Sequence, residues 1–111
     1  MNSIEINQLL KELHGSLAHL PISNSIAYEI ILISMLFYLN KKELSLKTLF
    51  ANSKSTEMGV RHHLNRLIEY EWLEMRQSEN DLRVKLVYPT TKLIQQYERF
   101  HKIRFDEKKV T

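Results

Sequence analysis

The chain has 111 residues, of which 43% are hydrophobic and 26% are charged, and its formal net charge is +3. This length suits one modest core, and the composition is ordinary for a soluble globular protein. The absence of cysteine excludes disulfides, thiol nucleophiles and cysteine zinc sites.

The positive charge lies in the later part of the chain. Residues 1–40 carry one lysine against three glutamates, whereas residues 41–111 carry fifteen basic and ten acidic groups. This asymmetry is compatible with a polyanionic partner. The N-terminal sequence lacks the features of a signal peptide, and the apolar run 30–39 is about half the length that spans a bilayer. We expect a cytoplasmic protein with no membrane segment.

The first helical signal is a narrow apolar seam that ends before Pro21. Its leucines and isoleucine recur at alternating spacings of four and three, a pattern typical of a helix that packs along one stripe. The residues of the seam are Ile6, Leu10, Leu13, Leu17 and Leu20. Two interpretations remain open, since the seam could pack within its own domain or be shared with a second subunit.

A second helix is predicted over residues 23–40, with Ser23 or Asn24 as its N-terminal cap. Apolar residues occupy nearly every side of this segment. A helix without a polar face belongs in the middle of a fold, so we interpret this one as core.

A helix-turn-helix is predicted next. Ser45 can cap a brief helix over 46–52, and an amphipathic helix follows from Ser53 to Glu71, with Ser53 or Ser55 as its cap. At about 100° per residue, one face of this second helix is apolar: Val60, Leu64, Leu67 and Ile68. The opposite face is mostly polar: Ser55, Met58, His62, Asn65, Arg66 and Glu69. Two short helices joined by a tight turn are typical of a DNA-binding unit.

After Glu71 the apolar period becomes that of strands. Residues 72–76 and 84–88 alternate, and the polar stretch between them predicts a hairpin with an exposed tip. Pro89 ends the second strand, and Thr90 is expected to cap a final helix. Its apolar side is Leu93, Ile94, Tyr97, Phe100 and Ile103.

The predicted fold class is mainly α with a small β-hairpin (α+β), a winged helix-turn-helix. We expect a single domain over residues 1–111. Residues 1–40 form its N-terminal and central helices, 44–88 the helix-turn-helix and wing, and 90–108 a C-terminal dimerisation helix.

A series of residues from Leu44 to about Leu93 makes the prediction more specific. A helix ends, a strand opens with leucine and a basic residue, the hairpin tip bears Asp-x-Arg, and a threonine starts the next helix. The series is Leu64, Leu67, Trp72-Leu73, Arg76, Asp81-Leu82-Arg83, Lys85-Leu86-Val87 and Thr90-Thr91-Lys92. This stretch resembles the DNA-binding module of the MarR family of bacterial transcription regulators. Glu71 departs from it, because the family usually has a helix-ending glycine there, and Leu93 replaces another frequent glycine.

The resemblance implies a homodimeric, sequence-specific regulator that binds double-stranded DNA, with one helix in the major groove and the wing at the minor groove. On the helix, Arg66 could donate twice to a guanine and Asn65 could pair with an adenine, with His62 between them. Ser55 and Thr56 lie where a helix N-terminus meets phosphate. The alternative is a polar face that is simply solvated.

On the wing, Arg83 is expected to enter a narrow minor groove. Asp81 would fix its direction through an ion pair, although such a pair could also serve only to stabilise the hairpin. Lys54 and Lys85 are predicted phosphate contacts.

A dimer would be held by two apolar stripes and would place its recognition helices about 34 Å apart, one turn of DNA. The predicted interface residues are Ile6, Leu10, Leu13, Leu17, Leu93, Tyr97, Phe100 and Ile103.

Catalytic and cofactor motifs are absent from the sequence, so we expect a non-enzyme without a cofactor. His62 and His63 are adjacent and point about 100° apart, which argues against a shared metal ion. A small-molecule effector stays undefined. A ligand pocket could lie between the helices around Leu17, Tyr28, Phe37 and Tyr97, but aromatic residues at helical spacing are more typical of core.

Two other functions remain open. Glutamates around the recognition helix would suit a winged helix that binds a protein instead of DNA. A DNA-binding role in replication or in plasmid or phage maintenance would use the same residues. Salt separates the first alternative from DNA binding, because only phosphate contacts weaken steeply with salt.

Overall fold

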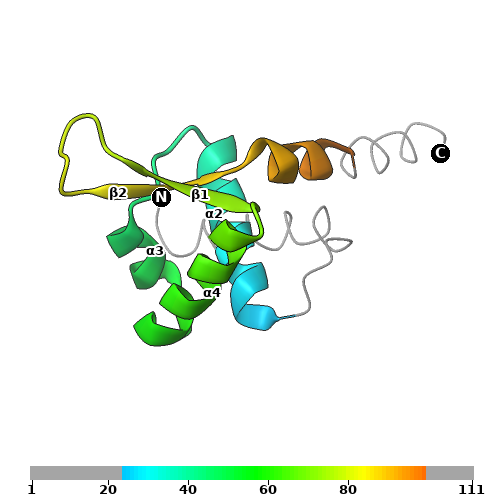
Figure 1. Cartoon of the computed structure of the whole chain (residues 1–111), viewed down its shortest axis with the longest axis horizontal. Coiled ribbons are helices and arrows are strands. Elements are labelled where there is room, and N and C mark those ends of the chain that lie inside the picture. Colours follow the sequence, from blue (N-terminus) through cyan, green and yellow to red (C-terminus); the bar gives the residue numbers. More distant parts are fainter. Residues whose placement is uncertain (1–23, 100–111) are drawn as a thin grey trace.

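The computed structural model describes residues 24–99 (Figure 1). It contains α2 (Ser25–Leu39), α3 (Leu46–Asn52), α4 (Glu57–Glu69), β1 (Leu73–Gln77), β2 (Lys85–Pro89) and a further helical stretch over 91–99. This order confirms the predicted winged helix-turn-helix. The predictions for the N-terminal seam, and for Phe100 and Ile103, lie outside the described residues.

The centre of the fold is α2, as its apolar sequence predicts. Nine of its residues are buried, and it packs against α3, α4 and β2. Of the two predicted caps, Asn24 is the one used: its side-chain oxygen accepts hydrogen bonds from the amides of Ile26 (2.9 Å) and Ala27 (3.1 Å). Within residues 24–99, no helix combines the length and the apolar character needed to cross a membrane.

The turn between α3 and α4 differs from the prediction. Ser45 caps α3 as expected, accepting from the Thr48 amide at 3.1 Å, but α4 begins later than Ser53. Its cap is Thr56, whose hydroxyl accepts from the Gly59 amide at 3.1 Å, and not Ser53 or Ser55.

The reason for this shift is a contact with α2. The Ser53 hydroxyl donates to a Glu29 carboxylate oxygen at 2.6 Å, and the Lys54 amide donates to the same oxygen at 3.2 Å. Ser53 also accepts from the Ser55 amide at 3.1 Å. These bonds hold residues 53–55 as a turn fastened to the central helix, so the first turn of α4 can start only after them.

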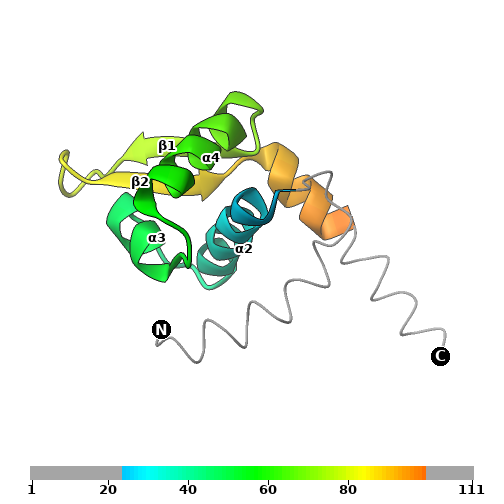
Figure 2. The same cartoon turned by 90° about the horizontal axis from the view of Figure 1, so that it is seen from below.

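The hairpin pairs β1 with β2 in antiparallel register, from Leu73 opposite Pro89 to Gln77 opposite Lys85. Both strands lie one residue later than predicted. Leu86 and Val87 are both buried, so strict alternation fails in β2. The edge of β2 is closed by residues 44–45, where the Val87 amide donates to the Leu44 carbonyl at 2.8 Å. The tip of the hairpin and the helical stretch 91–99 lie at opposite ends of the described structure (Figure 1, Figure 2).

Both α2 and α4 end in a Schellman turn without glycine. Residue Lys41 after α2 has φ 56°, and Glu71 after α4 has φ 64°. At α4 the Trp72 amide donates to the Leu67 carbonyl (2.9 Å) and the Glu71 amide to the Ile68 carbonyl (3.0 Å). Glycine is favoured at such a position, because a left-handed conformation costs other residues about 1–2 kcal/mol. The geometry therefore explains why glycine is usual where this chain has Glu71.

Replacing Glu71 with glycine should raise the free energy of unfolding by about 1 kcal/mol. The substitution removes the left-handed penalty, which exceeds the entropy that glycine adds to the unfolded chain. It also removes a carboxylate from the negative end of the α4 dipole. Urea unfolding measures the change. Glu71→Ala is the control, since it removes the charge but keeps the Cβ, and equal stability of the two variants would contradict the backbone explanation.

Candidate nucleic-acid interface

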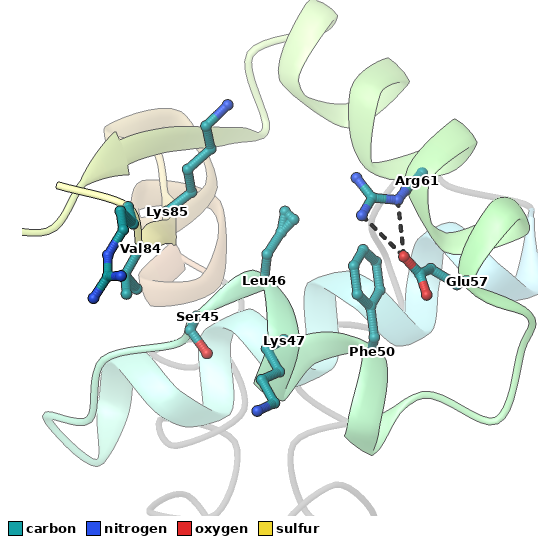
Figure 3. Close-up of a pocket in the computed structure, with 9 residues that line it drawn as sticks. Ser45, Leu46, Lys47, Phe50, Glu57, Arg61, Val84 and Lys85 are labelled. Carbon is teal, nitrogen blue, oxygen red and sulfur yellow. Dashed lines mark hydrogen bonds and ion pairs between the residues drawn. The ribbon is translucent and has the colours of Figure 1, made fainter. Parts of the chain in front are cut away.

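A concave groove of about 690 Å³ lies between α4 and the hairpin. Figure 3 shows α4 on one side, the wing on the other and α3 between them. Four cations and one carboxylate line this groove, which also contains Ser45, Leu46, Phe50 and Val84. The charged residues are Lys47 of α3, Glu57 and Arg61 of α4, and Arg83 and Lys85 of the hairpin. The groove therefore has a net positive charge contributed by three separate elements.

Arg61 is the groove residue that the sequence analysis missed most clearly. Its guanidinium donates to a Glu57 carboxylate oxygen from Nη2 (2.9 Å) and Nε (3.2 Å), and it lies 4.7 Å from the centre of the Phe50 ring. Successive residues of a helix are rotated by about 100° around its axis. Arg61, which comes directly after buried Val60, therefore projects from the flank of the apolar stripe and not from the opposite face. Only the position of the wing shows that this flank faces the groove. Lys47 was missed for the same reason.

The predicted residues of α4 lie on its exposed side but not all face the groove. His62, Asn65 and Arg66 are exposed. Arg66 lies about 140° around the helix from Arg61, where its guanidinium is 6.0 Å from the centre of the Tyr70 ring. The structure therefore separates Arg66 from the wing residues.

The predicted residues before α4 are arranged differently. Lys54 is exposed and Ser55 is half-buried, and the Thr56 hydroxyl is engaged in capping.

His62 and His63 place their rings edge to face with centroids 5.0 Å apart. Within residues 24–99, no group of three or more histidine, aspartate or glutamate side chains could hold a metal ion.

The wing tip positions Arg83 through Asp81. The Arg83 amide and Nε donate to Asp81 Oδ1 at 3.0 Å and 3.2 Å, and Nη2 donates to Oδ2 at 3.3 Å. The hairpin loop is closed by a hydrogen bond from the Ser78 amide to the Val84 carbonyl (2.9 Å). Although it is paired, the Arg83 side chain is 92% exposed. The predicted ion pair is present, and it leaves the guanidinium open to a ligand.

The Arg83 side chain, and after it the Arg83 amide, lower the pKa of the Asp81 carboxyl below its ordinary value. A lowered pKa means that the pair is intact at neutral pH and is lost as the pH falls through the lowered value. In Arg83→Ala the pKa of Asp81 should rise toward that of an ordinary aspartate. The rise should be partial, because the backbone amide of residue 83 still donates a hydrogen bond to the Asp81 carboxylate. Carbon-detected NMR titration of Asp81 measures this shift, and an unchanged pKa in the variant would contradict the pairing.

Solved structures similar to this chain were found, although no family model and no curated protein matches it. An S. aureus MepR–DNA complex is 22% identical, with a TM-score of 0.60, and the match covers 96% of this chain and 81% of that one. S. aureus MepR bound to ethidium bromide is 18% identical, with a TM-score of 0.65, and the match covers 97% and 73%. A mutant of E. coli MarR with operator DNA is 21% identical, with a TM-score of 0.57, and the match covers 89% and 68%.

The chain has the MarR-type winged-helix fold. The resemblance seen in the sequence is thereby confirmed at the level of the fold.

In this MarR-type fold the end of α4 is fastened by the start of the helical stretch 91–99. The Thr90 hydroxyl donates to the carbonyls of Glu71 (2.6 Å) and Trp72 (3.1 Å). The Lys92 ammonium donates to the Tyr70 carbonyl at 3.0 Å and lies 4.0 Å from the centre of the Trp72 ring. The Thr-x-Lys residues of the MarR-like series therefore hold the C-terminus of the helix that carries Arg61.

Of the predicted dimer residues, two lie in the described part of the MarR-type fold. Leu93 is 0% exposed and belongs to the core of this chain, so its side chain has no surface left for a partner. Tyr97 is half-buried against the same core, and burial raises the pKa of its phenol. Tyr28 and Phe37 pack there too, as expected for core aromatic residues.

Proposed function

We propose that the protein is a sequence-specific, double-stranded DNA-binding transcription regulator that acts as a homodimer. The observation that carries this proposal is the convergence of Lys47, Arg61, Arg83 and Lys85 on one groove beside an exposed helix. MepR and MarR, which share the fold, were solved in complex with DNA.

Each element has a distinct role in this proposal. α4 enters the major groove and presents His62 and Asn65 to base edges. Lys47, Arg61 and Lys85 contact the phosphate backbone that crosses the groove between α4 and the wing. Arg83, held outward by Asp81, enters the adjacent minor groove. Arg66 and Lys54, which lie outside the groove, are proposed to contact flanking phosphates.

Two of the glutamates that would suit a protein partner are paired with cations, which weakens that alternative. Glu57 is paired with Arg61 at 2.9 Å, and Glu74 is paired with Arg76. Each of these cations offsets a charge that would otherwise repel phosphate. The groove retains more positive than negative charge, which is the electrostatic character expected of a polyanion site.

Salt dependence tests the proposal. Five cations of each subunit are proposed to contact phosphates, which gives about ten contacts in a dimer. Fluorescence anisotropy of a labelled random-sequence duplex should therefore show binding that weakens by at least about a thousandfold between about 50 and 200 mM salt. Sedimentation of the complex should give two chains per bound site. An affinity for DNA that does not change with salt, or no binding at low salt, would contradict the proposal and would favour a protein partner for this face.

A further inference from the structure

The two most exposed large apolar side chains of the described residues lie on the two elements that flank the groove. Met58, in the first turn of α4, is 81% exposed, and Leu82, at the tip of the wing, is 70% exposed. Met58 projects from the side of α4 opposite buried Val60. His62 follows it one turn later on the same side. The exposed face of α4 therefore begins with an apolar residue and continues with polar ones.

The backbone beneath Met58 is held in place. Thr56 caps the first turn, accepting from the Gly59 amide at 3.1 Å. The preceding turn is fastened to Glu29 of α2. A Cβ built on Gly59 would lie in ordinary contact with Ile26 Cδ1 (3.6 Å) and tight against the Thr56 hydroxyl (3.2 Å), so this turn is closely packed on its inner side. A fixed backbone thus carries a long, unbranched side chain.

Resting on the proposed DNA-binding function, we propose that Met58 recognises the 5-methyl group of a thymine in the major groove. The N-terminal residues of a recognition helix are those that contact base edges. The thymine methyl is the apolar group that bases present in the major groove. A thioether side chain is flexible and polarisable, so it adapts to a small apolar contact. The neighbouring Glu57 is engaged by Arg61, which leaves Met58 as the base-facing side chain of this turn.

The test replaces thymine with deoxyuridine, which removes only the methyl group. A duplex selected from a random library by the native chain serves as the probe, first with every thymine replaced and then with each replaced singly. The native chain should lose about fourfold in affinity for each methyl contacted, which corresponds to the transfer of one carbon out of water. Met58→Ala should bind the thymine duplex more weakly and should bind the thymine and deoxyuridine duplexes equally. Met58→Leu should restore the preference for thymine.

Leu82→Ala is the matched control, because it removes another largely exposed apolar side chain, this one from the wing, and should keep the native preference for thymine. A native chain that binds both duplexes equally overturns the inference and leaves DNA binding intact. A Met58→Ala variant that keeps the preference also overturns it, since another residue must then contact the methyl. Failure of the native chain to bind any duplex overturns the proposed function itself.

Discussion

Replacing Arg61 and Arg83 together with alanine should lower the affinity for DNA by about a hundredfold or more for each subunit that is bound. The two substitutions remove cations from opposite sides of the groove, Arg61 from α4 and Arg83 from the wing. A hydrogen bond to a charged group contributes about 1.5 kcal/mol or more, and about 1.4 kcal/mol corresponds to a tenfold change. In Arg61→Ala the Glu57 carboxylate also loses its partner and repels phosphate. Anisotropy at fixed salt measures the loss.

Two controls separate a groove effect from a general effect of charge. Lys42→Ala removes the same charge from an exposed position that does not line the groove, so it should change affinity little. Glu57→Gln should change it in the opposite direction, because it releases Arg61 and removes a negative charge from the groove. Equal losses in Lys42→Ala and Arg61→Ala would show that the groove is not the binding surface. The folded state should survive, since both arginines are largely exposed.

Leu93→Ala should lower the free energy of unfolding by about 2–5 kcal/mol, the usual cost of removing a leucine side chain from a packed core. Leu93 is fully buried among residues of α2, α4 and the hairpin. Such a loss is a large part of the total stability of a small domain, which is about 5–15 kcal/mol. Urea unfolding at two protein concentrations measures it, and the loss should be the same at both.

The same substitution at Leu82 is the control. Leu82 lies exposed at the wing tip, so Leu82→Ala should leave the free energy of unfolding nearly unchanged. Had Leu93 been an interface residue, its substitution would mainly weaken the association of subunits, and the loss would grow as the protein is diluted. That outcome would return Leu93 to the predicted dimer interface.

The features predicted correctly from the sequence depend on contacts within a few residues. Ser45 caps a helix that starts beside it, and Asp81 pairs with Arg83 two positions later. The buried face of α4 follows from helical periodicity alone. Local geometry determines each of these features, so the sequence pattern was sufficient to predict them.

The features that the sequence did not predict depend on distant contacts. Ser53 does not start α4 because its hydroxyl donates a hydrogen bond to Glu29, 24 residues earlier. Arg61 belongs to the groove because the hairpin, formed later in the chain, packs on that flank of α4. Leu93 is buried because helix 91–99 turns back onto the core. No local sequence pattern contains these long-range contacts. The one available signal was that Arg61 lies four residues before Asn65 and is therefore its neighbour on the helix surface.

Trp72 is the only tryptophan of the chain, and it lies at the joint where Thr90 and Lys92 fasten the end of α4. Its indole is covered on one face by the Lys92 ammonium, so a change in the angle between α4 and the helical stretch 91–99 should alter the surroundings of this indole. Trp72 therefore serves as an intrinsic fluorescent probe of the C-terminal end of α4. Intrinsic emission can follow that joint, without a label, whenever DNA or a small molecule is added.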